Sequence, residues 1–243
     1  MDRISTAFPL SEEDISSFEE NGYLAAKGLF SLTEMESGKK AAKEMVEDQA
    51  GASGVFGWKA DMIPKVFDWF ACHPALVRVL CGLIGPEIEF LSAKTVFKSG
   101  RITFDSPWHQ DYAYWGGATK LSVWIALEDA TPENGCLKVI PESHKRFMEH
   151  SNIKDVNGFV NRILDGDLDG ARVVSVPMQS GDALVFHDCL LHSSYSNTSG
   201  RDRWCFIPTY RDATVPDESK VWVKTRVLRS TYTAPNTRFK TGR

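Results

Sequence analysis

The feature that most constrains this fold is a series of short apolar segments that begins near residue 90. Turns containing Gly, Pro, Asn and Asp separate six of them: "FLSAKTVF", "KLSVWIAL", "CLKVIP", "ARVVSVP", "DALVFHDCLLHSS" and "RWCFIPTY". Short strands divided by turn residues are typical of antiparallel sheets that close into a barrel or a jelly roll. The sequence therefore predicts a mainly β fold whose core occupies residues 90–243.

The first 89 residues have a mostly helical pattern. Ser11 is a suitable N-cap, Ile15 and Phe18 follow at helical spacing, and Gly22 ends the first helix. Two further helices are predicted in "LTEMESGKKAAKEMVEDQA" and "HPALVRVLCGLIG". No repeat or linker interrupts the 243 residues, so we expect a single domain in which these helices flank the barrel.

A polar insert near 149–170 interrupts the strand pattern. It contains "LDGDLDGA" and has the composition of a loop or lid over the barrel. Loops on a rigid scaffold often carry substrate contacts. Asn157, Phe159 and Arg162 are candidates for such contacts, although nothing in the insert identifies a substrate.

Charge and hydropathy limit the class of partner. The formal net charge is −4, so no basic field favours nucleic acid, and a small molecule is the expected partner. No run approaches the roughly 18 apolar residues of a membrane span, and the start lacks the apolar core of a signal peptide. We therefore expect a cytoplasmic protein without a membrane partner. The five scattered cysteines form no C-x-x-C pair and are expected to be free thiols; the oligomeric state is not indicated.

The stretch "WHQDYAYW" is the first candidate for a metal site. His109 and Asp111 are two residues apart, so on an extended strand both side chains face the same side and can converge on one point. An edge strand with its polar side chains in water would show the same pattern. By the same alternation Trp115 would line the pocket, whereas Tyr112 and Tyr114 would face away.

The second candidate region is "GDALVFHDCLLHSSYSNTSGRDRWCF". His187 and His192 are five residues apart and would lie on opposite faces of a regular strand, so one of them reaches the interior. An inward arginine, Arg201 or Arg203, would need a carboxylate partner. Two histidines and one carboxylate form the facial triad of non-haem Fe(II) oxygenases, and an arginine nearby suits a dicarboxylate cosubstrate.

These motifs together resemble the phytanoyl-CoA dioxygenase family of Fe(II)/2-oxoglutarate-dependent oxygenases. The resemblance runs through "FEENGYLAAKGLFS", "FKSGRITFDSPWHQDYAYW", "LSVWIALEDATPENGCLKVIPESHK" and "MQSGDALVFHDCLLHSSYSNTSGRDR". It implies a double-stranded β-helix core, which is a cupin-like jelly roll. Two positions depart from the family pattern, because Glu142 and Ser193 stand where the family usually has glycine.

The resemblance also implies the roles of individual residues. The iron ligands would be His109, Asp111 and His192. The residues that hold or line 2-oxoglutarate would be Arg203, Ser194, Gln110 and Trp124. His187 is expected in the core or in support of a ligand, and Arg201 at the surface. Lys94 and Lys98 would lie at a solvated strand edge, and whether either of them touches 2-oxoglutarate stays open.

The implied activity is oxidation of an unactivated C–H bond in a small metabolite or natural-product intermediate. Fe(II), 2-oxoglutarate and dioxygen would be required, and succinate and carbon dioxide would be released. Asp111 favours hydroxylation, desaturation or cyclisation over chlorination, because related halogenases have a small residue in place of the carboxylate. Two alternatives stay open: a cupin-like metal enzyme that does not use 2-oxoglutarate, and a non-catalytic ligand-binding barrel.

Overall fold

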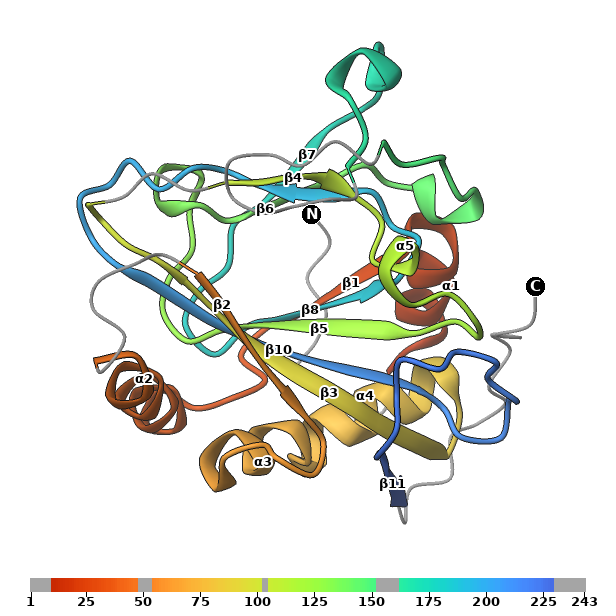
Figure 1. Ribbon diagram of the computed structural model, residues 1–243, viewed down its shortest axis with the longest axis horizontal. Helices are drawn as coiled ribbons and strands as arrows, with labels where there is room; N and C mark the ends of the chain where they lie inside the picture. Colours follow the sequence, from red (N-terminus) through yellow and green to blue (C-terminus); the bar gives the residue numbers. More distant parts are fainter. Residues whose placement is uncertain (1–9, 48–53, 102–104, 152–161, 230–243) are drawn as a thin grey trace.

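Two antiparallel sheets face each other in the computed structural model, which describes residues 10–47, 54–101, 105–151 and 162–229 (Figure 1). The seven-stranded sheet has the order β1 (Tyr23–Ala26), β8 (Ala183–His187), β5 (Leu121–Ala126), β10 (Arg203–Asp212), β3 (Glu87–Lys98) and β11 (Arg226–Arg229), and β2 (Gly54–Lys59) also pairs with β3. The four-stranded sheet has the order β4 (Ser106–His109), β9 (His192–Ser194), β6 (Leu137–Val139) and β7 (Val174–Val176). The predicted jelly roll is confirmed.

Alternation along the strands separates two environments on the large sheet. On β5, Leu121, Val123 and Ile125 pack toward the helices, whereas Trp124 and Ala126 face the small sheet. The residues of β5 that face the small sheet are less uniformly apolar than those that face the helices, because buried Ser122 lies on the same side of the strand as Trp124. The space between the sheets is therefore where polar side chains can gather.

The helices cover the outer face of the large sheet and begin and end largely as predicted. They are α1 (Glu12–Asn21), α2 (Leu32–Glu47), α3 (Lys65–Ala71) and α4 (Pro74–Ile84). Ser11 and Asp14 form a capping box at the start of α1, and Gly22 ends it at φ +80°. The helix α3 was not predicted, and neither were the strands β1 and β2 inside the part expected to be mostly helical.

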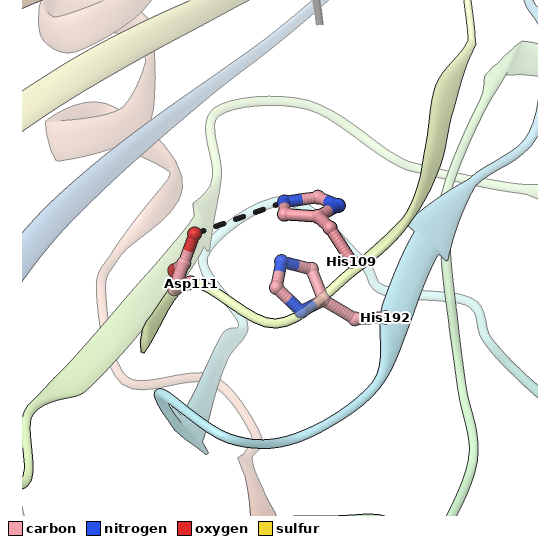
Figure 2. Close-up of side chains that lie close together, drawn as sticks. All are labelled: His109, Asp111 and His192. Atoms are coloured by element: carbon pink, nitrogen blue, oxygen red, sulfur yellow. Dashed lines mark ion pairs between the residues drawn. The ribbon is translucent and has the colours of Figure 1, made fainter. Parts of the chain in front are cut away.

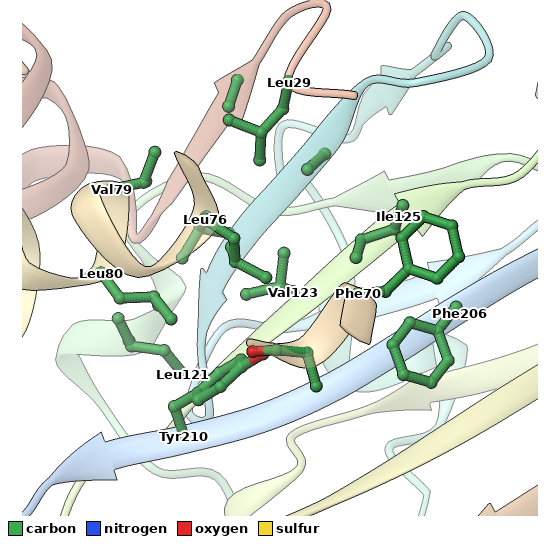
Figure 3. Close-up of a cluster of buried hydrophobic side chains, with 14 of the residues drawn as sticks. Leu29, Phe70, Leu76, Val79, Leu80, Leu121, Val123, Ile125, Phe206 and Tyr210 are labelled. Atoms are coloured by element: carbon green, nitrogen blue, oxygen red, sulfur yellow. The ribbon is translucent and has the colours of Figure 1, made fainter. Parts of the chain in front are cut away.

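An apolar core joins the helices to the large sheet (Figure 3). Phe70 of α3 and Leu76 of α4 pack with Phe206 and Tyr210 of β10, all of them almost fully buried. Burial of one such side chain stabilises the fold by about 1.5–3 kcal/mol. The Tyr210 hydroxyl donates a hydrogen bond to the Ala71 carbonyl at 2.6 Å, so the polar atom is satisfied as well. This core holds β5 and β10, whose other faces form the interior of the barrel.

The described ends of the 149–170 insert lie against the small sheet. The main chains of Ser151 and Arg162 form an isolated bridge, and Ile163 N–H donates to the Trp108 carbonyl at 2.8 Å. Ile163 also packs with Trp108 on the opposite side of β4 from His109. The expected substrate contacts Asn157 and Phe159 lie outside the described residues.

Two further expectations concern membrane-spanning helices and the state of the cysteines. Within the described ranges no single helix has the length and hydropathy to cross a membrane, and α3 with α4 passes such a test only as a pair bent by 42°. All five cysteines are free thiols, as predicted.

Candidate metal centre and cosubstrate site

His109, Asp111 and His192 converge at one end of the barrel interior (Figure 2). His109 ends β4 and lies opposite His192 on β9 in the small sheet, with their ring centroids 4.2 Å apart. His109 Nε2 is 3.7 Å from Asp111 Oδ1. The candidate ligand atoms of the three residues all lie within 4.8 Å of one another, and all three side chains are buried. The residues predicted as a metal triad are thus brought together.

The hydrogen bonds around the triad leave one ligand atom of each residue facing its partners. His109 Nδ1 lies 2.8 Å from the Pro107 carbonyl and His192 Nδ1 lies 2.9 Å from the Leu190 carbonyl. A carbonyl only accepts, so both Nδ1 atoms carry the proton and both Nε2 lone pairs are available. Asp111 Oδ2 accepts from the Ser122 hydroxyl at 3.0 Å, which leaves Oδ1 for a ligand role. This donor set fits a divalent metal.

The electrostatics favour the protonation states that bind metal. Burial lowers the pKa of His109 and of His192, and for His109 the neighbouring His192 lowers it further. Burial alone would raise the pKa of Asp111, but the positive charge of Lys94, the neighbouring imidazoles and the Ser122 hydrogen bond together hold that pKa below its usual value. Neutral imidazoles and an ionised carboxylate are the forms that coordinate iron.

The chain leaves the strand conformation after His109, so the alternation used to place the aromatic residues does not hold, and the prediction for Tyr114 is wrong. Asp111 has helical dihedrals (φ −57°, ψ −31°) and precedes the one-turn helix α5 (Tyr112–Trp115). The Trp115 ring packs against the Trp222 ring, with 5.5 Å between their centroids, and its place in the pocket stays a prediction. Tyr114, predicted to face away, instead meets the His109 ring edge-on at 6.0 Å and is 41% exposed.

The predicted cosubstrate residues gather further along the interior. Arg203 is almost fully buried on β10, and its guanidinium lies 5.3 Å from the ring centroid of Trp124. The same guanidinium donates to the Gly135 carbonyl at 2.8 Å. Ser194 extends from β9, two residues beyond His192, and its hydroxyl accepts from Lys98 Nζ at 2.8 Å. This places a hydroxyl and two cations on the side of the barrel next to the triad.

The prediction of a solvated edge is wrong for Lys98. Lys98 is fully buried, pairs with Arg203 across β3 and β10, and also donates to the Tyr195 carbonyl. Burial and the charge of Arg203 lower the Lys98 pKa to about 7. Lys94, also on β3, is half-buried and its Nζ lies 3.7 Å from Asp111 Oδ1. Both lysines share the inward parity of β3, a signal that the strand pattern already contained.

The predicted cosubstrate role of Gln110 is not supported, because its side chain serves the polypeptide backbone. Gln110 is fully buried, and its Nε2 donates to the carbonyls of Arg146 and Cys189 at 2.8 and 2.6 Å. Its Oε1 accepts from Met148 N–H at 2.8 Å. His150 Nε2 in turn accepts from the Gln110 backbone N–H at 2.9 Å. Gln110 and His150 together tie the start of the insert to the segment between two triad residues.

The structure also places His187 and Arg201, the other histidine and arginine considered for the site. His187 lies on β8 of the large sheet rather than on the strand of His192, and its Nδ1 accepts from Cys189 N–H at 3.0 Å. His187, Asp188 and Cys189 form a second group of potential metal ligands, but Asp188 Oδ2 already accepts from Lys120 N–H at 3.2 Å. Arg201 is exposed, as predicted.

Comparison with known proteins identifies the family. The sequence profile of the phytanoyl-CoA dioxygenase (PhyH) family matches residues 18–205. The chain belongs to the phytanoyl-CoA dioxygenase family. Bovine peroxisomal phytanoyl-CoA dioxygenase is 28% identical over 234 residues, which covers 84% of this chain and 69% of the relative. The L-proline trans-4-hydroxylase of Streptomyces griseoviridis is 29% identical over 163 residues, 58% of this chain and 61% of the hydroxylase.

Solved structures agree with this assignment. The non-haem α-ketoglutarate-dependent carbocyclase SnoK of nogalamycin biosynthesis superposes with a TM-score of 0.72 at 25% identity, covering 84% of this chain and 85% of SnoK. The epimerase SnoN, solved with Fe³⁺ and α-ketoglutarate, shares the fold at a TM-score of 0.69 and 20% identity, covering 84% of each chain. This phytanoyl-CoA dioxygenase family member is an iron- and 2-oxoglutarate-dependent oxygenase that acts on C–H bonds.

Proposed function

We propose that His109, Asp111 and His192 are the iron ligands of this oxygenase. The observation that carries the proposal is the convergence of two Nε2 atoms and one carboxylate oxygen, each with its other polar atom hydrogen-bonded. When bound, the iron and 2-oxoglutarate supply the oxidation of a C–H bond, with release of succinate and carbon dioxide. The protein supplies the ligand geometry and keeps the imidazoles neutral.

We further propose that Arg203, Lys98 and Ser194 bind the far carboxylate of 2-oxoglutarate. Arg203 is almost fully buried, and its Nε has no hydrogen-bond partner among the described residues, so a carboxylate would complete its hydrogen bonding. Lys98 Nζ and the Ser194 hydroxyl are hydrogen-bonded to each other on the neighbouring strands. Trp124 supports the guanidinium from one side. An arginine can grip a carboxylate with two parallel hydrogen bonds, which also orients the cosubstrate toward the triad.

The primary substrate is proposed to be a small molecule that approaches the triad from the side of Tyr114 and Lys94. These two side chains flank the triad and are partly exposed, unlike its other described neighbours Ser122 and Phe186. The L-proline trans-4-hydroxylase among the relatives supports a small-molecule substrate. The cytoplasmic location and the lack of nucleic-acid and membrane partners stay predictions of the sequence.

Spectroscopy and succinate assays test these roles. Anaerobic Fe(II) and 2-oxoglutarate should give the wild type a weak visible charge-transfer band, and Asp111→Ala should not retain the metal. Arg203→Ala should still bind Fe(II) but lose about 10- to 100-fold in 2-oxoglutarate affinity, because a charge-assisted bond contributes about 1.5–3 kcal/mol. Arg201→Ala, two residues away and exposed, is the matched control. Undiminished succinate release by Arg203→Ala would contradict the proposal.

A further inference from the structure

Lys94 places an ammonium group beside the metal triad, where the reaction has so far given it no role. Its side chain extends from the inward face of β3 and is 31% exposed. Nζ lies 3.7 Å from Asp111 Oδ1, the oxygen that also faces His109 Nε2. Among the described residues Nζ makes no hydrogen bond within 3.5 Å, so its position is not explained by an internal partner other than Asp111.

The neighbouring strand leaves Lys94 accessible. Gly57 on the edge strand β2 lies directly opposite Lys94, and paired residues point to the same face of a sheet. A Cβ built on Gly57 would meet only the Ala93 carbonyl, at 4.0 Å. Val55, two residues away with the same parity, is 48% exposed. The ammonium of Lys94 therefore borders open space next to the triad.

The distribution of charge calls for an anion at this position. Once a divalent cation binds Asp111 Oδ1, Lys94 shares that oxygen with a like charge and loses most of its attraction to it. Arg203 and Lys98 are already assigned to the far carboxylate of 2-oxoglutarate, and the metal takes the near end of that molecule. The cosubstrate therefore leaves Lys94 without a carboxylate.

We propose that Lys94 binds a carboxylate of the primary substrate, so that the substrate is a small carboxylic acid held beside the iron. Gly57 leaves this face of the strand pair open, because a side chain there would share the face with Lys94. The assignment rests on the proposed metal triad and deepens it by naming the substrate class. An ion pair with Lys94, whose Nζ lies 3.7 Å from Asp111 Oδ1, would fix which C–H bond of the acid faces the triad.

The test uses the full chain loaded with Mn(II), a paramagnetic substitute for Fe(II), and saturated with 2-oxoglutarate. The probes are acetate and its uncharged analogue acetamide, and the readout is the relaxation of their methyl protons by Mn(II). We expect strong relaxation of acetate and little of acetamide. Lys94→Met should reduce the acetate affinity by roughly tenfold, the effect of losing one charge-assisted hydrogen bond. Lys94→Arg should largely retain it.

Two further variants make the test specific. Gly57→Val leaves all charges in place but adds a side chain beside Lys94, so acetate relaxation should fall as well. Lys40→Met removes a lysine that is 78% exposed on α2 and should change nothing. Both variants should take up Mn(II) and 2-oxoglutarate like the wild type, which also shows that they fold.

Three results would overturn the assignment, and they differ from one another. Acetate relaxation that is the same in Lys94→Met and the wild type would show that acetate binds elsewhere. If calorimetry shows that Lys94→Met binds 2-oxoglutarate at least roughly tenfold more weakly than the wild type, Lys94 binds a carboxylate of the cosubstrate and not of the primary substrate. Wild-type protein that binds neither Mn(II) nor 2-oxoglutarate would instead refute the proposed metal triad, and the assignment with it.

Discussion

Replacing Gln110 by methionine tests whether this residue anchors a loop or contacts the cosubstrate. Methionine has a similar length but cannot hydrogen-bond to the main chain. The substitution removes three bonds, to the carbonyls of Arg146 and Cys189 and from the N–H of Met148. The Gln110 backbone bond to His150 is left in place. The perturbation is therefore confined to the side-chain hydrogen bonds that tie Gln110 to the start of the insert and to Cys189.

The size of the effect follows from the burial of these partners. Leaving a buried donor or acceptor unpaired costs about 1–3 kcal/mol, and three groups are affected here. The loop partners are only partly buried and can reach water, so we expect the free energy of unfolding to fall by about 3–5 kcal/mol. Because Gln110 lies between His109 and Asp111, metal affinity should also fall, by about 10- to 100-fold. At saturating metal, 2-oxoglutarate affinity should change by less than about twofold, since the side chain faces the loop.

Two measurements on the Gln110→Met protein separate the alternatives. Urea unfolding of the metal-free protein, followed by circular dichroism, gives the stability change. Calorimetry with the Mn(II)-loaded protein gives the 2-oxoglutarate affinity. A stability loss below about 1 kcal/mol together with a tenfold loss of 2-oxoglutarate affinity would refute the loop-anchor role and restore the role predicted from the sequence.

Three further substitutions probe the cosubstrate site and one turn. Burial lowers the Lys98 pKa to about 7, and a bound carboxylate would raise that pKa again. Binding of 2-oxoglutarate at pH 8 should therefore be accompanied by the uptake of as much as roughly 0.9 proton. Calorimetry in buffers of different ionisation enthalpy measures this uptake, which should be abolished in Lys98→Met. Gly135→Ala places a Cβ 2.7 Å from Lys98 Cδ, on a backbone with φ +94°, so the 2-oxoglutarate affinity should fall by about tenfold or more. The control is Gly166→Ala, whose added Cβ has no atom within 4 Å and should leave the affinity unchanged. Glu142 has φ 66°, so Glu142→Gly should raise the free energy of unfolding by about 1 kcal/mol, and an unchanged or lower urea midpoint would contradict this.

The parts of the fold that were predicted correctly are those specified by local patterns. The capping box at Ser11 and the glycine at position 22 bound α1 because they satisfy hydrogen bonds within a few residues. The inner strands were visible because a buried strand is a short apolar run. Edge strands lack that signal: β2, "GVFGWK", has two glycines and one face toward solvent, so its place beside β3 depends on tertiary pairing.

The errors at the site arise where burial overrides composition. A lysine on a strand is usually solvated, and that expectation failed for Lys98 because Ser194 and the Tyr195 carbonyl supply partners from a distant part of the chain. A glutamine between two metal ligands suggests a contact with the cosubstrate. The Gln110 amide instead donates its hydrogen bonds to backbone carbonyls 36 and 79 residues away in the sequence. Neither partner set is visible in the residues adjacent in sequence.

The metal triad itself was predicted from a geometry that the chain does not adopt. On a continuous strand His109 and Asp111 would be separated by about 6.7 Å along the axis, with both side chains on the same face. Instead, Asp111 has helical dihedrals and the chain turns into α5 directly after it, while the ligand atoms of the triad lie within 4.8 Å of one another. The turn brings the Tyr114 ring to the His109 ring and packs the Trp115 ring against Trp222. The change of backbone conformation after His109 therefore selects which aromatic ring borders the triad, and hydrogen bonds from Gln110 to His150 and from Met148 to Gln110 tie this segment to the start of the insert.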